Sequence, residues 1–154
     1  MDAATAQEMK GYSTSFTVDR PPREVFDAIN DVRGWWTGEI TGGAAAVGEA
    51  FTYRYGELHR STQKVVELVP GRRIVWEVTD ASLSFVPEPS EWKGTRIVFE
   101  LARKGALTEV RFTHQGLVPR LQCYRDCSSG WRFYIEDSLH GLLAIGRGDP
   151  GSKD

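Results

Sequence analysis

A broad apolar stripe at helical spacing runs through the C-terminal stretch 119–146. Its members lie mostly three or four positions apart: Leu121, Tyr124, Cys127, Trp131, Tyr134, Ile135, Leu139, Leu142, Leu143 and Ile145. This period predicts an amphipathic helix with one apolar face. Pro119 suits the first turn of such a helix, and Gly146, with Pro150 beyond it, forms a stop signal. A single helix of this kind needs an apolar surface to pack against.

The weakest part of the predicted helix is the segment 127–130, which contains Gly130. Glycine inside a helix costs about 1 kcal/mol relative to alanine. Two interpretations are therefore open. Either one helix runs through Gly130, or a short first turn precedes a main helix that Asp126 or Ser128 caps.

Most of the remaining chain alternates apolar and polar positions with a period of two, which predicts half-buried strands. The segments with this pattern are 11–19, 50–56, 61–69, 72–79, 95–103 and 107–115. Pro70 and Gly71 mark a hairpin turn between two of them. After the first strand, Pro22 opens a predicted helix over Pro22–Asn30, and Asp31 can cap a second short helix over 32–38.

Two segments lack a regular pattern. The Gly- and Ala-rich segment 41–50 is predicted to be a loop, and 80–94 is the least regular part of the chain, open to a short added strand at 83–86. The predicted order is one strand, two short helices, five or six antiparallel strands and a long helix. This order predicts an α+β fold, in which the long helix covers the aromatic face of an antiparallel sheet. A strongly twisted sheet that grips one helix leaves space between them, and that space is the candidate site.

Composition narrows the class of protein. A chain of 154 residues with 40% hydrophobic and 26% charged residues is typical of one globular domain. The net charge of -2 gives no reason to expect a nucleic-acid partner. The first ten residues do not resemble a signal peptide, and no run approaches the roughly 18 apolar residues of a membrane helix. We therefore expect a cytoplasmic protein, with Cys123 and Cys127 as reduced thiols.

Four stretches carry a family pattern: SFTVDRPPREVFDAINDVRGWW, KVVELVPGRRIVWEVTD, EWKGTRIVFELARKGALTEVRFTHQGL and CYRDCSSGWRFYIEDSLHGLL. In this order they resemble the START-like (SRPBCC, birch-pollen-allergen-like) superfamily. Within it they resemble bacterial stand-alone members of the branch homologous to the activator of the ninety-kilodalton heat-shock protein ATPase. The resemblance covers residues 11–148 as a single domain and leaves 1–10 and 149–154 as flexible tails. It implies a helix-grip fold, with a curved antiparallel sheet wrapped around a long C-terminal α-helix and two short helices after the first strand.

The resemblance also implies a cavity between the sheet and the long helix, where relatives bind lipids, polyketides or other apolar molecules. Strand alternation and the helical stripe give ten candidate ligand-binding residues: Trp35, Trp36, Phe51, Tyr53, Trp76, Phe99, His114, Tyr124, Trp131 and Tyr134. For each ring alone, core packing is the competing interpretation. Trp92 is either a lid over the cavity mouth or an interface residue. We expect a cavity of roughly 300–1,000 Å³ that opens near Trp35–Trp36 and the segment 80–94.

Candidate chemistry is sparse. His114 follows Val110 and Phe112 on the inward face, where it could orient a ligand or act as an acid or base, with a core histidine as the competing interpretation. Cys123 and Cys127 are interpreted chiefly as buried packing residues, with a redox pair as the alternative. Metal-ligand and phosphate-loop spacings are missing from the sequence, so we predict no metal and no cofactor.

The predicted function is the binding of an apolar or aromatic small molecule, lipid-like or polyketide-like, in the cavity. One alternative is a cyclase, dehydratase or hydrolase that acts in the same cavity, with His114 as its acid or base. The other is a co-chaperone-like interaction module that binds a protein partner or a second copy of the chain. No nucleic-acid partner and no membrane span are expected.

Overall fold

The computed structural model describes residues 11–36, 39–55, 59–83, 92–118 and 124–145 of the chain. Seven antiparallel strands form one sheet in the order β1-β7-β6-β5-β4-β3-β2. They are β1 (Gly11–Val18), β2 (Glu39–Gly42), β3 (Ala50–Tyr55), β4 (His59–Val69), β5 (Arg73–Leu83), β6 (Arg96–Lys104) and β7 (Leu107–Gln115). Register shifts between β4 and β5, at Thr62/Gln63 and Val65/Glu67, are bulges of the kind that bend a sheet.

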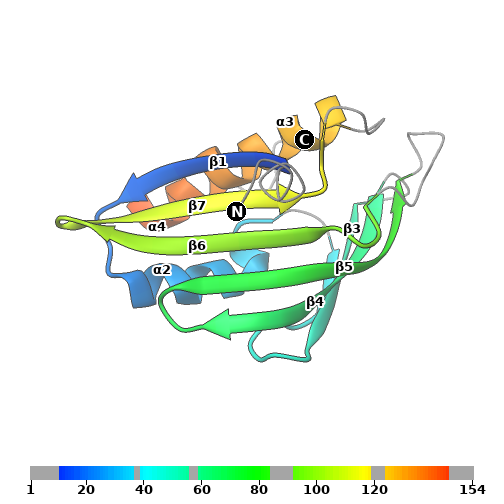
Figure 1. The fold of residues 1–154 in the computed structure, drawn as a ribbon, viewed down its shortest axis with the longest axis horizontal. Coiled ribbons are helices and arrows are strands. Elements are labelled where there is room, and N and C mark those ends of the chain that lie inside the picture. Colours follow the sequence, from blue (N-terminus) through cyan, green and yellow to red (C-terminus); the bar gives the residue numbers. More distant parts are fainter. Residues whose placement is uncertain (1–10, 37–38, 56–58, 84–91, 119–123, 146–154) are drawn as a thin grey trace, which may run out of the picture.

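The helices of the described residues all lie on one face of this sheet, behind it in the view of Figure 1. They are α2 (Pro22–Asn30), the 3₁₀ turn η1 (Val32–Gly34), α3 (Tyr124–Arg132), the π-helical segment η2 (Phe133–Leu139) and α4 (His140–Ile145). The last three follow one another without a gap and form one long C-terminal helix. The α+β helix-grip fold expected from the sequence is therefore confirmed.

Most predicted elements appear where the pattern placed them. The helix over Pro22–Asn30 has the predicted bounds and buries Val25, Phe26 and Ile29 on one side. The strand over Leu107–Gln115 is also as predicted, with Val110, Phe112 and His114 facing inward. The second short helix is reduced to η1, and the side chain of Asp31 makes no capping hydrogen bond to it.

Other elements differ from the prediction. The strand β2 was not predicted: it begins in the gap between the predicted second helix and the predicted loop at 41–50 and overlaps that loop by two residues. The strand β5 continues to Leu83, through residues expected to be irregular. The long helix passes through Gly130 without a break, and its irregular part, η2, begins three residues later. The expected helix start at Pro119, the expected tails and most of the possible strand at 83–86 lie outside the described residues.

The core is an aromatic layer between the sheet and the helices. Its largest fully buried rings are Trp35, Trp76, Phe51, Phe99 and Phe112. Phe99 contacts Trp35, Trp76 and Phe112 with ring centroids 5.2–6.0 Å apart in edge-to-face geometry, an arrangement that stabilises beyond burial alone. Trp131 brings the long helix into this layer, because its ring lies 4.6 Å from that of Phe112.

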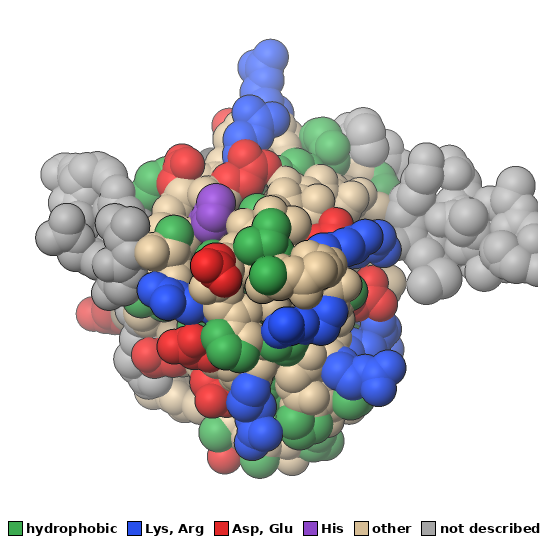
Figure 2. Space-filling model, turned by 90° about the vertical axis from the view of Figure 1, so that its left-hand side faces the viewer, with side chains coloured by type: hydrophobic (Ala, Val, Ile, Leu, Met, Phe, Trp, Pro, Cys, Tyr) green, Lys and Arg blue, Asp and Glu red, His purple; other side chains and the backbone are tan. Residues whose placement is uncertain are grey.

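The outer surface is charged. On the solvent face of the sheet Arg73 pairs with Glu67 and Glu100 on the neighbouring strands. Figure 2 shows the end of the molecule at the left of Figure 1, where Lys and Arg side chains alternate with Asp and Glu and hydrophobic side chains form small groups between them. This mixture is typical of a solvated surface. None of the helices in the described part of the chain is long and apolar enough to cross a membrane.

The central position of Trp131 gives a stability prediction. The substitution Trp131→Ala should lower the free energy of unfolding by about 3–5 kcal/mol, because it leaves a large cavity between helix and sheet. Chemical denaturation measures this change. Ser129→Ala, at an exposed position of the same helix, is the matched control and should have little effect. A denaturation midpoint that Trp131→Ala leaves unchanged would contradict the packing described above.

Candidate ligand-binding pocket

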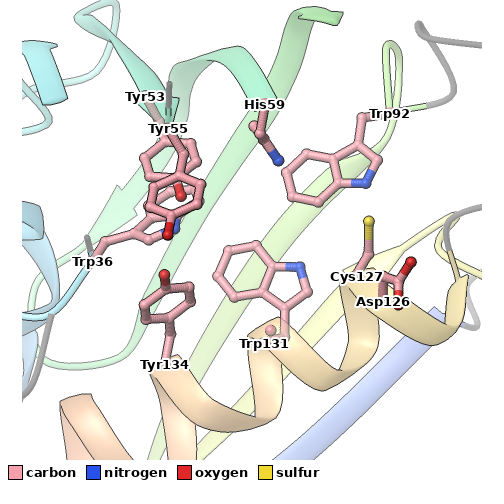
Figure 3. Close-up of a pocket in the computed structure, with 10 residues that line it drawn as sticks. Trp36, Tyr53, Tyr55, His59, Trp92, Asp126, Cys127, Trp131 and Tyr134 are labelled. Carbon is pink, nitrogen blue, oxygen red and sulfur yellow. The ribbon is translucent and has the colours of Figure 1, made fainter. Parts of the chain in front are cut away.

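A pocket of about 240 Å³ opens where the end of the sheet diverges from the start of α3, at the right of Figure 1. Its wall consists of Trp36, Tyr53, Tyr55, His59, Trp92, Asp126, Cys127, Gly130, Trp131 and Tyr134. Figure 3 shows Trp36, Tyr53 and Tyr55 on one side, His59 and Trp92 on the sheet side, and the helix residues below. The pocket opens beside Trp36 and Trp92, as expected, but it is smaller than the predicted range.

The smaller volume has a clear cause. The ring of Trp36 stacks on Tyr53 with centroids 4.4 Å apart and lies 5.0 Å from the ring of Trp131. These contacts fill the middle of the layer with rings. The empty space of this pocket lies toward the first turns of α3, where Gly130 has no side chain to occupy it.

The ten candidate residues are divided by the structure into two groups. Trp36, Tyr53, Trp131 and Tyr134 lie on the pocket wall. Trp35, Phe51, Trp76, Phe99 and His114 are buried in the core behind it, and Tyr124 is half-buried at the start of α3. These six residues pack in or against the core and do not line the pocket.

Sequence reasoning did not include several wall residues among the candidates. His59 and Asp126 carried no pattern that marked them, and Trp92 was left between a lid and an interface role. In the structure Trp92 is only 3% exposed, so it is a wall residue and not an exposed interface residue. Cys127 is buried on the wall, whereas Cys123 lies outside the described residues. The density of aromatic residues was the one signal that pointed to Trp92.

A chain of hydrogen bonds supports the wall from behind. The indole N–H of Trp131 donates to His114 Nδ1 at 3.0 Å. Because an indole nitrogen can only donate, Nδ1 must be unprotonated and the proton of the neutral ring lies on Nε2. Nε2 then donates to Thr95 Oγ1 at 2.8 Å, and the Thr95 hydroxyl donates to the backbone oxygen of Trp92 at 2.6 Å. His114 thereby connects the helix to the segment that carries Trp92.

These bonds determine what His114 can do. Both ring nitrogens have partners and the ring is fully buried, so it does not reach the pocket. Burial, with a smaller contribution from the nearby His59, lowers the pKa of His114 to about 3. Such a histidine is a very weak base, and its place in the fold is that of a positioning residue.

The polar groups on the wall are few. His59 lies edge-on to Tyr53 and Trp92, its Nε2 is 3.1 Å from Ser61 Oγ, and burial lowers its pKa to about 4. Tyr53 is hydrogen-bonded to Tyr134 and Trp36, and burial raises the pKa of its hydroxyl. Among the residues described, no three His, Cys, Asp or Glu side chains come together in a way that could hold a metal ion. The site is suited to holding an apolar ring.

A curved antiparallel sheet that holds one long helix, with an aromatic pocket between them, defines a START-like (SRPBCC) domain. Residues 19–144 match the family model described as "Activator of Hsp90 ATPase homolog 1-like protein". The chain belongs to this family. No curated protein matches the chain.

Solved structures agree with this assignment. The Aha1 dimer from Colwellia psychrerythraea is 27% identical over 88% of this chain and 97% of its own, with a TM-score of 0.71. DynU16, a protein of the dynemicin biosynthetic locus, is 16% identical over 88% of this chain and 48% of its own, with a TM-score of 0.63. CalU16 from Micromonospora echinospora is 17% identical over 85% of this chain and 73% of its own, with a TM-score of 0.57. The last two show the fold alone, and this chain spans about half the length of DynU16.

The lowered pKa values of His59 and His114 predict acid sensitivity. Their folded-state pKa values lie below the ordinary value of 6.5, so the unfolded chain binds more protons below that pH. The stability associated with them is fully present above pH 6.5 and falls as the pH decreases toward 4. His114 contributes up to about 1.4 kcal/mol per pH unit in this window, and the half-buried His59 contributes less.

Urea denaturation between pH 7 and pH 4.5 measures this slope. His114→Asn keeps an acceptor for Trp131 and removes the titrating group, so the variant should have a shallower slope than the unaltered protein. Equal slopes in the two proteins would show that His114 is not held neutral by burial.

Proposed function

We propose that this protein binds a small apolar, ring-containing molecule in the pocket between β3, β4, Trp92 and α3. The observation that carries the proposal is the composition of the wall, in which the side chains of six Trp and Tyr residues surround a space that no side chain fills. Deeper in the same aromatic layer the ring of Phe99 contacts those of Trp35, Trp76 and Phe112. Burying apolar surface of a flat ligand against such rings stabilises a complex by roughly 25 cal/mol per Å².

The contacts that hold the pocket wall in place also support ligand binding. Trp36, Tyr53 and Trp131 are held by ring contacts and hydrogen bonds that do not involve a ligand, so the wall is formed in advance. A preformed site loses little conformational entropy when it binds. DynU16, which shares the fold, belongs to the dynemicin biosynthetic locus, and this accords with a role for the present chain in small-molecule metabolism.

The enzyme alternative receives no support from His114, because that ring is enclosed and both of its nitrogens have partners. A second copy of the chain is the protein partner that an observation favours, since the Colwellia homologue was solved as a dimer. We propose that this chain self-associates as well. Sedimentation velocity at micromolar concentration tests this.

Gly130 offers a direct test of ligand binding. It lies on the pocket wall, and a Cβ built there meets nothing within 4 Å. Gly130→Leu should therefore extend a side chain into the empty pocket without a clash. The neutral fluorescent probe N-phenyl-1-naphthylamine should bind the unaltered protein with a dissociation constant on the order of 10 μM. Gly130→Leu should weaken that binding at least tenfold, on the order of 1.4 kcal/mol.

The controls separate blocking of the pocket from damage to the fold. Gly130→Leu should not lower the free energy of unfolding, because leucine is a better helix former than glycine. Ser129→Leu adds the same side chain at the exposed neighbouring position and should leave probe affinity unchanged. If both variants bind the probe as well as the unaltered protein does, the probe is not in this pocket and the proposed function is wrong.

A further inference from the structure

The strand β1 forms one edge of the sheet and contains no charged residue, proline or bulge. It lies at the end of the strand order and, within the described part of the chain, pairs only with β7 (Figure 1). Its eight residues read GYSTSFTV, and their register against β7 runs from Gly11 to Val18 without a shift. Edge strands are normally short, charged, interrupted by proline or bent by a bulge, because their outward N–H and C=O groups can pair with another chain.

The two edges of the sheet differ in this respect. The strand β2, at the opposite edge, has only four residues and begins with the exposed Glu39, and both features oppose pairing with another strand. On the solvent face of β1 the side chains of Ser13, Ser15 and Thr17 are small, neutral and exposed. They leave room for a further strand alongside. The edge that β1 forms is therefore the one suited to a partner strand.

The long helix places two opposite charges beside this edge. The guanidinium group of Arg132 donates a hydrogen bond to the Tyr12 hydroxyl, and Thr14 Oγ1 donates to Glu136 Oε2 at 2.5 Å. Four helical residues rise about 6 Å and two strand residues about 6.8 Å, so the helix and β1 run side by side in the same direction. The edge therefore carries a cation and then an anion in a fixed order.

We infer that two copies of this chain pair antiparallel through β1, about a two-fold axis that passes between their Ser13 residues. This inference rests on the self-association proposed above and specifies its surface. In this register Tyr12 lies opposite the partner's Thr14, so Arg132 of each copy faces the partner's Glu136. An axis at Thr14 would bring the two Glu136 carboxylates together, and an axis at Tyr12 the two Arg132 groups. Charge complementarity therefore favours Ser13.

A lysine on the axis tests the surface by sedimentation velocity. Ser13→Lys places two like charges directly opposite each other and should weaken dimerisation at least tenfold. Thr17→Lys is the matched control, at an exposed position on the same face of the same strand. Its two ammonium groups would lie about 27 Å apart across the axis, beyond the screening length of about 8 Å at physiological salt, and dimerisation should not change. Urea denaturation shows whether both variants keep the fold.

Charge reversal tests the register. Arg132→Glu and Glu136→Arg should each be monomeric alone, because like charges then meet across the axis. An equimolar mixture of the two variants should form a heterodimer, in which both pairs are attractive again. Native mass spectrometry distinguishes this heterodimer once one variant carries a heavy isotope label. Damage to the fold of either variant would not be repaired by mixing.

Amide hydrogen exchange tests the same surface in the unaltered protein, so the inference does not depend on any variant that fails to fold. Every second N–H group of β1 should exchange more slowly at a concentration where the dimer dominates than at one where the monomer does, because it gains an acceptor on the partner strand. The N–H groups of β2, at the other edge, should exchange equally at both concentrations.

The outcomes are distinct. If the unaltered protein dimerises but Ser13→Lys does so equally well, the copies pair through another surface, and the inference alone is wrong. A mixture of the charge-reversed variants that stays monomeric would overturn the register centred on Ser13. If the unaltered protein is a monomer at all concentrations, both the inference and the proposed self-association are wrong, and the proposal of ligand binding is unaffected.

Discussion

The hydrogen bond from Trp131 Nε1 to His114 Nδ1 is the contact on which the arrangement of this protein depends. It joins the long helix to β7 inside the aromatic layer, where water is excluded and an unpaired polar group would be costly. It also assigns the proton of His114 to Nε2, which then holds Thr95 and, through it, the backbone of Trp92. Gly116 allows this approach, because its φ of 99° suits glycine and a Cβ there would lie 2.7 Å from Thr95 Cγ2.

The same constraint explains why the pocket lies at one end only. Further along the helix Ser138 donates to the backbone oxygen of Trp35, which ties the helix to the turn that follows η1. Ser138 lies in the π-helical segment, an irregularity that is frequent at functional sites and here follows directly on the pocket-facing turns. Toward the start of α3 the sheet diverges, and Gly130 leaves space where another residue would fill it.

The period of the apolar positions correctly predicted elements whose residues repeat a regular apolar and polar pattern. The strand over Leu107–Gln115, the helix over Pro22–Asn30 and the inward position of His114 all follow from alternation or helical spacing. Tyr55 has the parity of Phe51 and Tyr53 and lies on the pocket wall with Tyr53, but it is 45% exposed because the strand ends there. The strand β2 was missed because it has only four residues, the last two of them in the Gly- and Ala-rich segment, and because its pairing with β3 is a tertiary contact.

The sequence predicted only part of the pocket wall, because tertiary contacts bring the other wall residues to the pocket. Trp36, Tyr53, Trp131 and Tyr134 belong to regular elements or to the turn next to one, so their inward direction could be inferred. Trp92 precedes β6 and His59 begins β4, and both are brought to the pocket by contacts between segments far apart in the sequence. The partners of His114 are likewise tertiary. Alternation indicated that the ring points inward but not that Trp131 and Thr95 occupy both its nitrogens.

The measurement that tests the aromatic pocket most directly is isotope-filtered NOE spectroscopy of the labelled protein with bound, unlabelled N-phenyl-1-naphthylamine. We expect intermolecular NOEs from the probe to the side chains of Trp36, Trp92 and Trp131, and none to the groove near Arg20 and His140 at the other end of the helix. NOEs confined to that groove, or to residues of the solvent face of the sheet, would contradict the assignment of the site.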